Sequence, residues 1–215
     1  MQIFPKFSNK IIVHLSGKVY RKANARFCRG YAVAKGEGAW YNRTKETQGG
    51  VDMLGKLRNM TAIYLLKGEK VLLLYRKGGR VVTDVWTGSA GGHFESDELN
   101  DARACVLREL REELGLGEEN LEGLTMRYVA LRNTKGEIRQ NYYFFAQLRG
   151  DAPQDLRSAE GDVKWFSLDA LGPVEMPLSA KFVMDHYCAV GRYTDKLYAA
   201  VVNPEGATFT DLSQS

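Results

Sequence analysis

Three glutamates, Glu109, Glu112 and Glu113, lie within five residues of one another in a segment with helical periodicity. At about 100° per residue, their side chains fall within roughly 100° of one another, and the leucines of the segment form a separate stripe. Like charges at i,i+4 destabilise a helix by about 0.2–0.5 kcal/mol, so this face needs an explanation. A solvated acidic surface is one explanation. A site for a hard divalent cation is the other, because Mg²⁺ prefers carboxylate and carbonyl oxygens and keeps substrate phosphates as further ligands.

The residues around these glutamates favour the cation site. Arg108 precedes Glu112 by one helical turn, and from there its guanidinium can orient that carboxylate by a charge-assisted hydrogen bond. Gly91 and Gly92 lie before the helix and let the backbone pass close to a ligand, where a Cβ would clash. A glycine loop that leads into a helix places backbone groups next to side-chain ligands.

Residues 91–116, "GGHFESDELNDARACVLRELREELGL", resemble the Nudix box, G-x5-E-x7-R-E-U-x-E-E-x-G-U, in which U is aliphatic. The second half of the pattern matches position by position from Arg108 to Leu116. Gly92 and Glu98 fit the first half, but nine residues separate Glu98 from Arg108 where the pattern has seven. The loop is therefore longer by two residues, and either Glu98 or Glu95 fills the first glutamate position.

The resemblance continues on both sides of the box, over about residues 53–202, to the branch called MutT-like or 8-oxo-dGTP diphosphatase-like. It implies Mg²⁺-dependent hydrolysis of a nucleoside diphosphate linked to another group. The first candidate substrate is a nucleoside triphosphate, including one with an oxidised purine, which would be cleaved to the monophosphate and pyrophosphate. ADP-ribose or another dinucleotide or sugar nucleotide is the alternative substrate class. A non-catalytic nucleotide-binding regulator is the third hypothesis, and the intact R-E-U-x-E-E argues against it because such modules commonly lose glutamates.

The same resemblance implies the site residues. Mg²⁺, with Mn²⁺ as the alternative, is the implied cofactor, and Arg108 and Glu98 accompany its ligands in the catalytic set. The implied metal ligands are the carboxylates of Glu109, Glu112 and Glu113, the Gly92 carbonyl and an additional glutamate, Glu160. For Glu160, an exposed loop position is an equally good reading. The candidate substrate contacts are Arg132, Asn141 and Tyr143; weaker candidates are Phe145, Trp165, His93 and Lys181.

Hydrophobic patterns predict the elements that position these residues. Strands are expected at 61–66, 70–77, 81–92, 125–134, 139–148, 162–168 and 195–202, followed by a polar tail over 203–215. Helices are expected at 101–114, with Asn100 or Asp101 as N-cap and Gly115 as C-terminal stop, and at 178–191. The predicted fold is an α/β, Nudix-type α/β/α sandwich with a mixed, mostly antiparallel sheet, against which Leu107, Leu110 and Leu114 pack. In the second helix, the expected apolar positions are Phe182, Met184, Tyr187 and Val190.

Composition bounds the classes of protein that remain. The 215 residues are 44% hydrophobic and 26% charged, enough for one domain with an extension. Three separated cysteines argue against a disulfide framework, and the apolar runs are too short to cross a bilayer. No signal-peptide pattern is found at the start. A cytoplasmic protein with a nucleotide substrate is expected, and the sequence leaves the oligomeric state open.

The charge is unevenly distributed. Residues 1–52 carry ten Lys/Arg and three Asp/Glu, or +7, whereas the remainder carries 20 basic and 23 acidic residues, or −3. The expected boundary therefore separates a basic N-terminal extension, 1–52, from a Nudix domain, 53–215. The extension is expected to lie outside the catalytic domain, and a start codon assigned too early at Met1, with Met53 as the true initiator, would explain it. The alternative is a basic arm for an acidic partner or nucleic acid.

Overall fold

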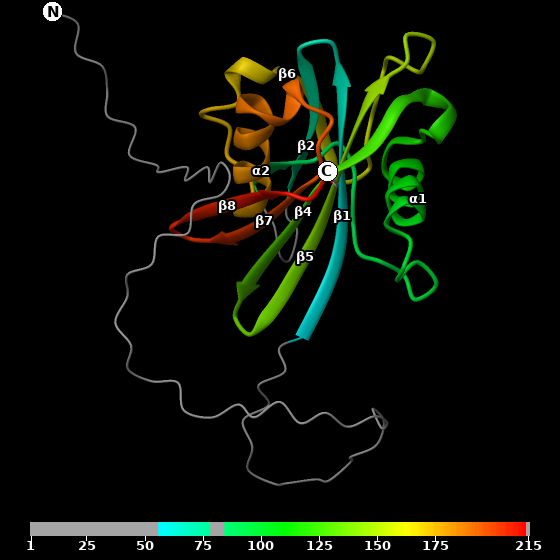
Figure 1. Cartoon of the computed structure of the whole chain (residues 1–215). Coiled ribbons are helices and arrows are strands. Elements are labelled where there is room, and N and C mark those ends of the chain that lie inside the picture. Colours follow the sequence, from blue (N-terminus) through cyan, green and yellow to red (C-terminus); the bar gives the residue numbers. More distant parts are fainter. Residues whose placement is uncertain (1–55, 78–83, 214–215) are drawn as a thin grey trace, which may run out of the picture. The chain divides into compact units, whose positions relative to one another are not determined.

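The computed structural model describes residues 56–77 and 84–213 (Figure 1). The predicted extension over 1–52, the boundary at 53 and Cys28 lie outside these residues. The strands are β1 (Lys56–Lys67), β2 (Lys70–Arg76), β3 (Val85–Thr87), β4 (Leu121–Thr134), β5 (Glu137–Leu148), β6 (Gly161–Ser167), β7 (Tyr198–Asn203) and β8 (Gly206–Asp211). The helices are α1 (Ala102–Leu114) and α2 (Leu178–Ala189), with short 3₁₀ turns η1 (Glu118–Asn120), η2 (Leu168–Ala170) and η3 (Gly191–Tyr193).

The strands form one mixed sheet in the order β3-β2-β1-β5-β4-β7-β8, with β6 paired to β2. The β1/β5 and β4/β7 pairs are parallel and the other pairs are antiparallel, as predicted. The β4–β5 hairpin turns at Lys135 and Gly136, which have φ of 53° and 75°. A two-residue hairpin turn with two positive φ values matches the twist of the strands that it joins. This hairpin places β1 and β4 on either side of β5 in the centre of the sheet.

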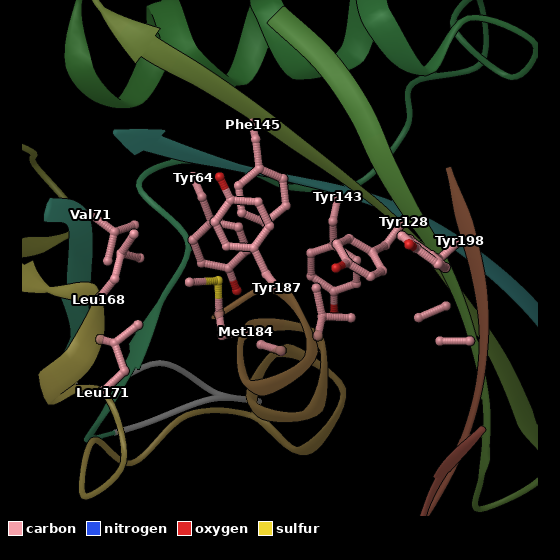
Figure 2. Packing of buried hydrophobic residues seen from close by; sticks show 14 of the residues in the cluster. Tyr64, Val71, Tyr128, Tyr143, Phe145, Leu168, Leu171, Met184, Tyr187 and Tyr198 are labelled. Atoms are coloured by element: carbon pink, nitrogen blue, oxygen red, sulfur yellow. The ribbon is translucent and has the colours of Figure 1, made fainter. Parts of the chain in front are cut away.

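Alternating side chains divide the core into two layers, one on each face of the sheet. Along β1, Ile63 and Leu65 face α1, and Tyr64 and Leu66 face α2. The helices lie on opposite sides of the sheet, so the predicted sandwich is confirmed (Figure 1). Figure 2 shows the aromatic layer between the sheet and α2, where the rings of Phe145 and the α2 residue Tyr187 are stacked at 4.0 Å.

The predicted limits of α1 are confirmed. Asp101 is the N-cap, and its carboxylate accepts hydrogen bonds from the backbone N–H groups of Arg103 and Ala104. Gly115 ends the helix in the left-handed region, at φ 67°. Leu110 and Leu114 are buried against the sheet as predicted, whereas Leu107 is half-buried and packs at the edge of that layer. The prediction missed Cys105 and Val106, which are fully buried.

Predictions about the C-terminal third are confirmed only in part. In α2, the predicted Met184 and Tyr187 are buried and the predicted Phe182 and Val190 are partly buried against the core, whereas the buried Val183 and His186 were missed. The expected polar tail is not a tail: residues 206–211 form β8, antiparallel to β7, and Phe209 stacks on His186 at 4.0 Å. A polar strand is stable here because only one of its faces is covered.

Two further findings concern the class of protein. Among the described residues, no helix combines the length and apolar character that crossing a membrane requires. Cys105 and Cys188 are both free thiols.

Candidate functional site

The glycine loop before α1 is fixed to β1 by backbone hydrogen bonds. The Thr61 N–H donates to the Gly92 carbonyl at 2.8 Å, and Gly91 has φ of 150°. A Cβ at Gly91 would collide with the Thr61 carbonyl, and a Cβ at Gly92 would collide with the Glu109 carboxylate. Gly91 is therefore required by its close approach to the backbone of β1, whereas a side chain at Gly92 would displace the carboxylate of Glu109. The loop forms a cradle against the carboxylate face of α1.

Arg108 connects the loop to three carboxylates. Its Nε and Nη2 donate to the two oxygens of Glu98 at 2.7 and 3.0 Å, and its Nη1 donates to Glu109 at 2.9 Å and to Glu112 at 3.0 Å. Its Nη2 also donates to the His93 carbonyl at 3.0 Å. The predicted bond from Arg108 to Glu112 is thus present. The guanidinium orders the face by charge-assisted hydrogen bonds rather than by packing.

The structure brings Glu98, and not Glu95, to Arg108. The Glu98 side chain is buried, and the backbone N–H of Glu95 donates to it at 3.0 Å, while Glu95 itself is exposed. The hydrogen bonds from Arg108 lower the pKa of Glu98 to about 2. After Glu98 the chain turns into α1, with the Asp101 N–H donating to the Glu98 carbonyl at 2.7 Å.

Glu113 is the buried member of the three glutamates on α1. Its carboxylate accepts from Arg76 Nη2 at 2.7 Å and from the Gly91 N–H at 3.1 Å. Arg76 also pairs with Glu160 at 2.7 Å, so the structure brings Glu160 to the same site. Burial raises the pKa of Glu113 against the attraction of Arg76, and the nearby Glu160 raises it further. Arg76 was not predicted as a site residue from the sequence. The available signal was its position as a cation at the end of the apolar run "VLLLYR".

The other two glutamates are progressively more exposed. The Glu109 side chain is 12% exposed, and burial raises its pKa, whereas the Glu112 side chain is 58% exposed. For Glu109, burial outweighs the attraction of Arg108, and a bound cation would further favour the charged carboxylate. The face therefore contains both an enclosed and a solvent-facing oxygen donor.

The donor set fits a hard divalent cation, although no three of its members converge on one point. Within residues 56–77 and 84–213, no group of three or more His, Cys, Asp or Glu side chains is arranged to hold a metal ion. Instead, Arg76 and Arg108 occupy the inner oxygens of the carboxylates. The Gly92 carbonyl already accepts one hydrogen bond and retains a second lone pair. The predicted roles of these groups as metal ligands stay predictions.

A pocket of about 580 Å³ opens beside the loop. Its lining includes Gly92, Glu160 and all three predicted substrate contacts, Arg132, Asn141 and Tyr143. It also includes side chains that the sequence analysis missed, namely Tyr64, Arg58, Arg139, Arg76 and Lys77. The structure thus places the carboxylate face next to a pocket rich in cationic side chains.

The weaker substrate candidates divide between the pocket and the core. His93 lines the pocket. Phe145 is buried between the sheet and α2, and Trp165 packs on the α1 side of the sheet, so neither lines the pocket. Lys181 donates to Asp185 at 2.6 Å within α2 and does not line the pocket either. Tyr142 and Tyr143 face opposite sides of the sheet, so only Tyr143 lines the pocket.

Comparison with known proteins agrees with this geometry. The family model described as NUDIX domain matches residues 56–187. The NAD-capped RNA hydrolase NudC from Pseudomonas aeruginosa strains is 30% identical over 143 residues, covering 66% of this chain and 48% of the relative. The chain therefore spans about half the length of the curated relatives that it matches.

Solved structures share the fold at low sequence identity. A MutT protein from Bacillus halodurans is 20% identical, with a TM-score of 0.51, covering 73% of this chain and 95% of that one. A MutT protein from Methanosarcina mazei Go1 is 18% identical, with a TM-score of 0.52, covering 68% and 100%. An Ap4A hydrolase from C. elegans is 20% identical, with a TM-score of 0.50, covering 65% and 99%.

Proposed function

Because this chain belongs to the Nudix family, we propose that it is a Mg²⁺-dependent pyrophosphohydrolase that cleaves a nucleoside diphosphate linked to a second group. One observation carries the proposal: the carboxylate face of α1 meets a cation-lined pocket through the Gly91–Gly92 loop and Arg76. The carboxylates suit a divalent cation, and the pocket suits the anionic substrate on which that cation acts.

The side chains have separable roles in this proposal. A bound Mg²⁺ supplies Lewis-acid neutralisation of phosphate oxygens and polarisation of the attacking water. Glu109, Glu112 and Glu113 hold it, and Arg108 keeps two of these carboxylates oriented through its hydrogen bonds. Arg76 neutralises Glu113 and Glu160 in the free protein. Arg76 also lines the pocket, so with a cation bound to these carboxylates its guanidinium would be available to a phosphate oxygen of the substrate.

A dinucleotide is the preferred substrate class. The curated relatives at 30% identity are named NAD-capped RNA hydrolases, which supports a diphosphate flanked by two nucleosides. The pocket of about 580 Å³ lies within the ordinary size range of ligand pockets. A nucleoside triphosphate is the second candidate, favoured by the resemblance of the box and its flanking segments to the MutT-like branch.

A substrate panel tests the proposal. The full chain is incubated with Mg²⁺ and, separately, NAD, ADP-ribose, dGTP and 8-oxo-dGTP, and the products are separated by ion-exchange chromatography. AMP with nicotinamide mononucleotide identifies dinucleotide cleavage, and monophosphate with pyrophosphate identifies triphosphate cleavage. Excess chelator should abolish either activity. A folded chain that hydrolyses none of the four with Mg²⁺ or Mn²⁺ would instead be a non-catalytic nucleotide-binding module.

A further inference from the structure

Three arginines form a row across the centre of the sheet. Arg58 of β1 lies in register with Arg139 of β5, and Arg139 lies in register with Arg132 of β4. They occupy the strand positions of the α2 face, six residues before Tyr64 on β1 and four before Tyr143 on β5. All three line the 580 Å³ pocket. The row therefore forms one wall of the proposed substrate site.

The positive charge of this row is only partly compensated. Glu137 accepts from Arg58 Nε at 3.2 Å and from Arg139 Nε at 2.6 Å. Three guanidinium groups and one carboxylate leave a local formal charge of 3 − 1 = +2. His93 lines the same pocket, and partial burial together with Arg58 and Arg139 lowers its pKa. The neighbouring imidazole thus favours its neutral form beside this charge.

Two polar groups in the pocket lack partners among the described residues. Arg132 makes no ion pair there, and its Nε is buried without a hydrogen-bond acceptor. The Tyr64 side chain is fully buried, and its hydroxyl also lacks a hydrogen-bond partner. A buried donor left unpaired costs about 1–3 kcal/mol. The unpaired Nε of Arg132 leaves one donor of the arginine row without an acceptor in the pocket.

The arginine row lies about the length of a nucleoside from the Gly91–Gly92 loop, which is next to the carboxylates of α1. The glycine loop contacts β1 at Thr61, whose N–H donates to the Gly92 carbonyl. Arg58 lies three residues earlier on the same strand. At about 3.3 Å per residue, the two points are roughly 10 Å apart. One molecule can therefore present a diphosphate to the loop and another anionic group to the arginines.

We propose that Arg58, Arg132 and Arg139 bind a phosphate monoester on the substrate's ribose, remote from the diphosphate that is cleaved. The inference rests on the proposed function and narrows its substrate to nucleotides that carry this extra phosphate. A phosphate monoester carries a charge of about −1.5 to −2 at neutral pH, which matches the +2 of the row. Guanidinium groups bind phosphate oxygens in pairs of parallel hydrogen bonds, and the Nε of Arg132 has no acceptor among the described residues.

Binding of product-like nucleotides tests the inference without turnover. Isothermal titration of the full chain compares AMP with adenosine 2′,5′-bisphosphate and adenosine 3′,5′-bisphosphate. At least one bisphosphate should bind about tenfold more tightly than AMP. This preference should disappear in Arg132→Gln and in Arg58→Gln. Arg149→Gln is the matched control, because Arg149 pairs with the exposed Asp151 and does not line the pocket.

The outcomes separate this inference from the proposed function. Equal binding of AMP and both bisphosphates by the unmodified chain would overturn the inference, as would a preference that survives both arginine substitutions. Hydrolysis of NAD and NADP is measured in parallel. If neither is cleaved while the arginine-dependent preference is present, the inference stands and dinucleotide hydrolysis is wrong. If NAD is cleaved and no preference is found, dinucleotide hydrolysis stands and the inference is wrong.

Discussion

At the scale of single residues, Arg108 determines how the glutamates of α1 are presented. One guanidinium contacts Glu98 with two donors and reaches Glu109 and Glu112 with a third. A charged hydrogen-bond network of this kind is sensitive to loss of one member, because the remaining charges are left unpaired. Its buried and exposed members should therefore respond differently to substitution.

Glu98→Gln should destabilise the fold as well as reduce activity. Glutamine cannot accept two charge-assisted bonds from Arg108, and the side chain is only 7% exposed, so about 1–3 kcal/mol of stability should be lost. Urea denaturation monitored by circular dichroism measures this loss. The matched control is Glu95→Gln, in the same loop but exposed, which should leave the denaturation midpoint unchanged. Equal effects of the two substitutions would contradict the assignment of Glu98 to the box position.

Glu112→Gln should abolish turnover without affecting the fold. The side chain is 58% exposed and contributes one contact, to Arg108, so little stability depends on it. If it holds Mg²⁺ during the reaction, kcat should fall by roughly 100-fold or more, about 2.7 kcal/mol of transition-state stabilisation. The measurement is hydrolysis of the best panel substrate at saturating Mg²⁺. Glu122→Gln, an exposed glutamate of β4, is the control, and a Glu112 variant as active as this control would exclude Glu112 from the mechanism.

At the scale of elements, the start of α1 determines where the carboxylates point. Asp101 caps two backbone N–H groups of the first turn, and the helix then projects its acidic face toward the glycine loop. Asp101→Ala should cost about 1 kcal/mol, because those donors lose their acceptor. Thermal denaturation should show the loss, with Asp97→Ala in the exposed loop as control. An unchanged midpoint in Asp101→Ala would mean that the cap does not contribute to the stability of α1.

At the scale of the whole molecule, β8 and α2 enclose a histidine that makes stability depend on pH. His186 is buried, its Nδ1 lies 2.9 Å from the Tyr128 hydroxyl, and burial lowers its pKa below the ordinary 6.5. The unfolded chain therefore binds a proton more readily than the folded chain, and stability should rise with pH. The contribution is fully present above about pH 6.5 and is lost as the pH falls toward the lower folded pKa.

The comparison of the unmodified chain with His186→Gln isolates this contribution. Urea denaturation at about pH 7.5 and about pH 5.5 gives the free energy of unfolding of each chain. The unmodified chain should lose more stability on acidification than the variant, because glutamine does not titrate. Other groups, Glu113 among them, affect both chains alike and cancel in the difference. The same pH dependence in the two chains would show that the pKa of His186 does not differ between the folded and unfolded states.

The boundary of the domain belongs to the same scale. We propose that residues 53–215 fold and act without the basic segment 1–52, whose formal charge of +7 contrasts with the −3 of the remainder. A chain that begins at Met53 should melt cooperatively and hydrolyse the same nucleotides as the full chain. An insoluble or inactive product would place part of 1–52 within the domain.

Short-range regularities in the sequence were sufficient for much of the fold. The spacing of the leucines and glutamates predicts α1 and its two faces, and Asp101 and Gly115 mark its ends, because periodicity and capping depend on neighbours within one or two turns. Alternating apolar residues likewise predict β1, β4 and β5. β8 was missed because its alternation is weak, with Phe209 the buried side chain of an otherwise polar strand.

The tertiary structure decided which distant residues meet. Sequence spacing left Glu95 and Glu98 as alternatives, and only the path of the loop, returned to β1 by the glycines, brings Glu98 to Arg108. Arg76 reaches Glu113 and Glu160 because β2 ends beside both α1 and the start of β6. Arg58, Arg132 and Arg139 form one row through the register of three strands. Strand register is a long-range property: a shift of one residue would turn each of these side chains to the other face of the sheet.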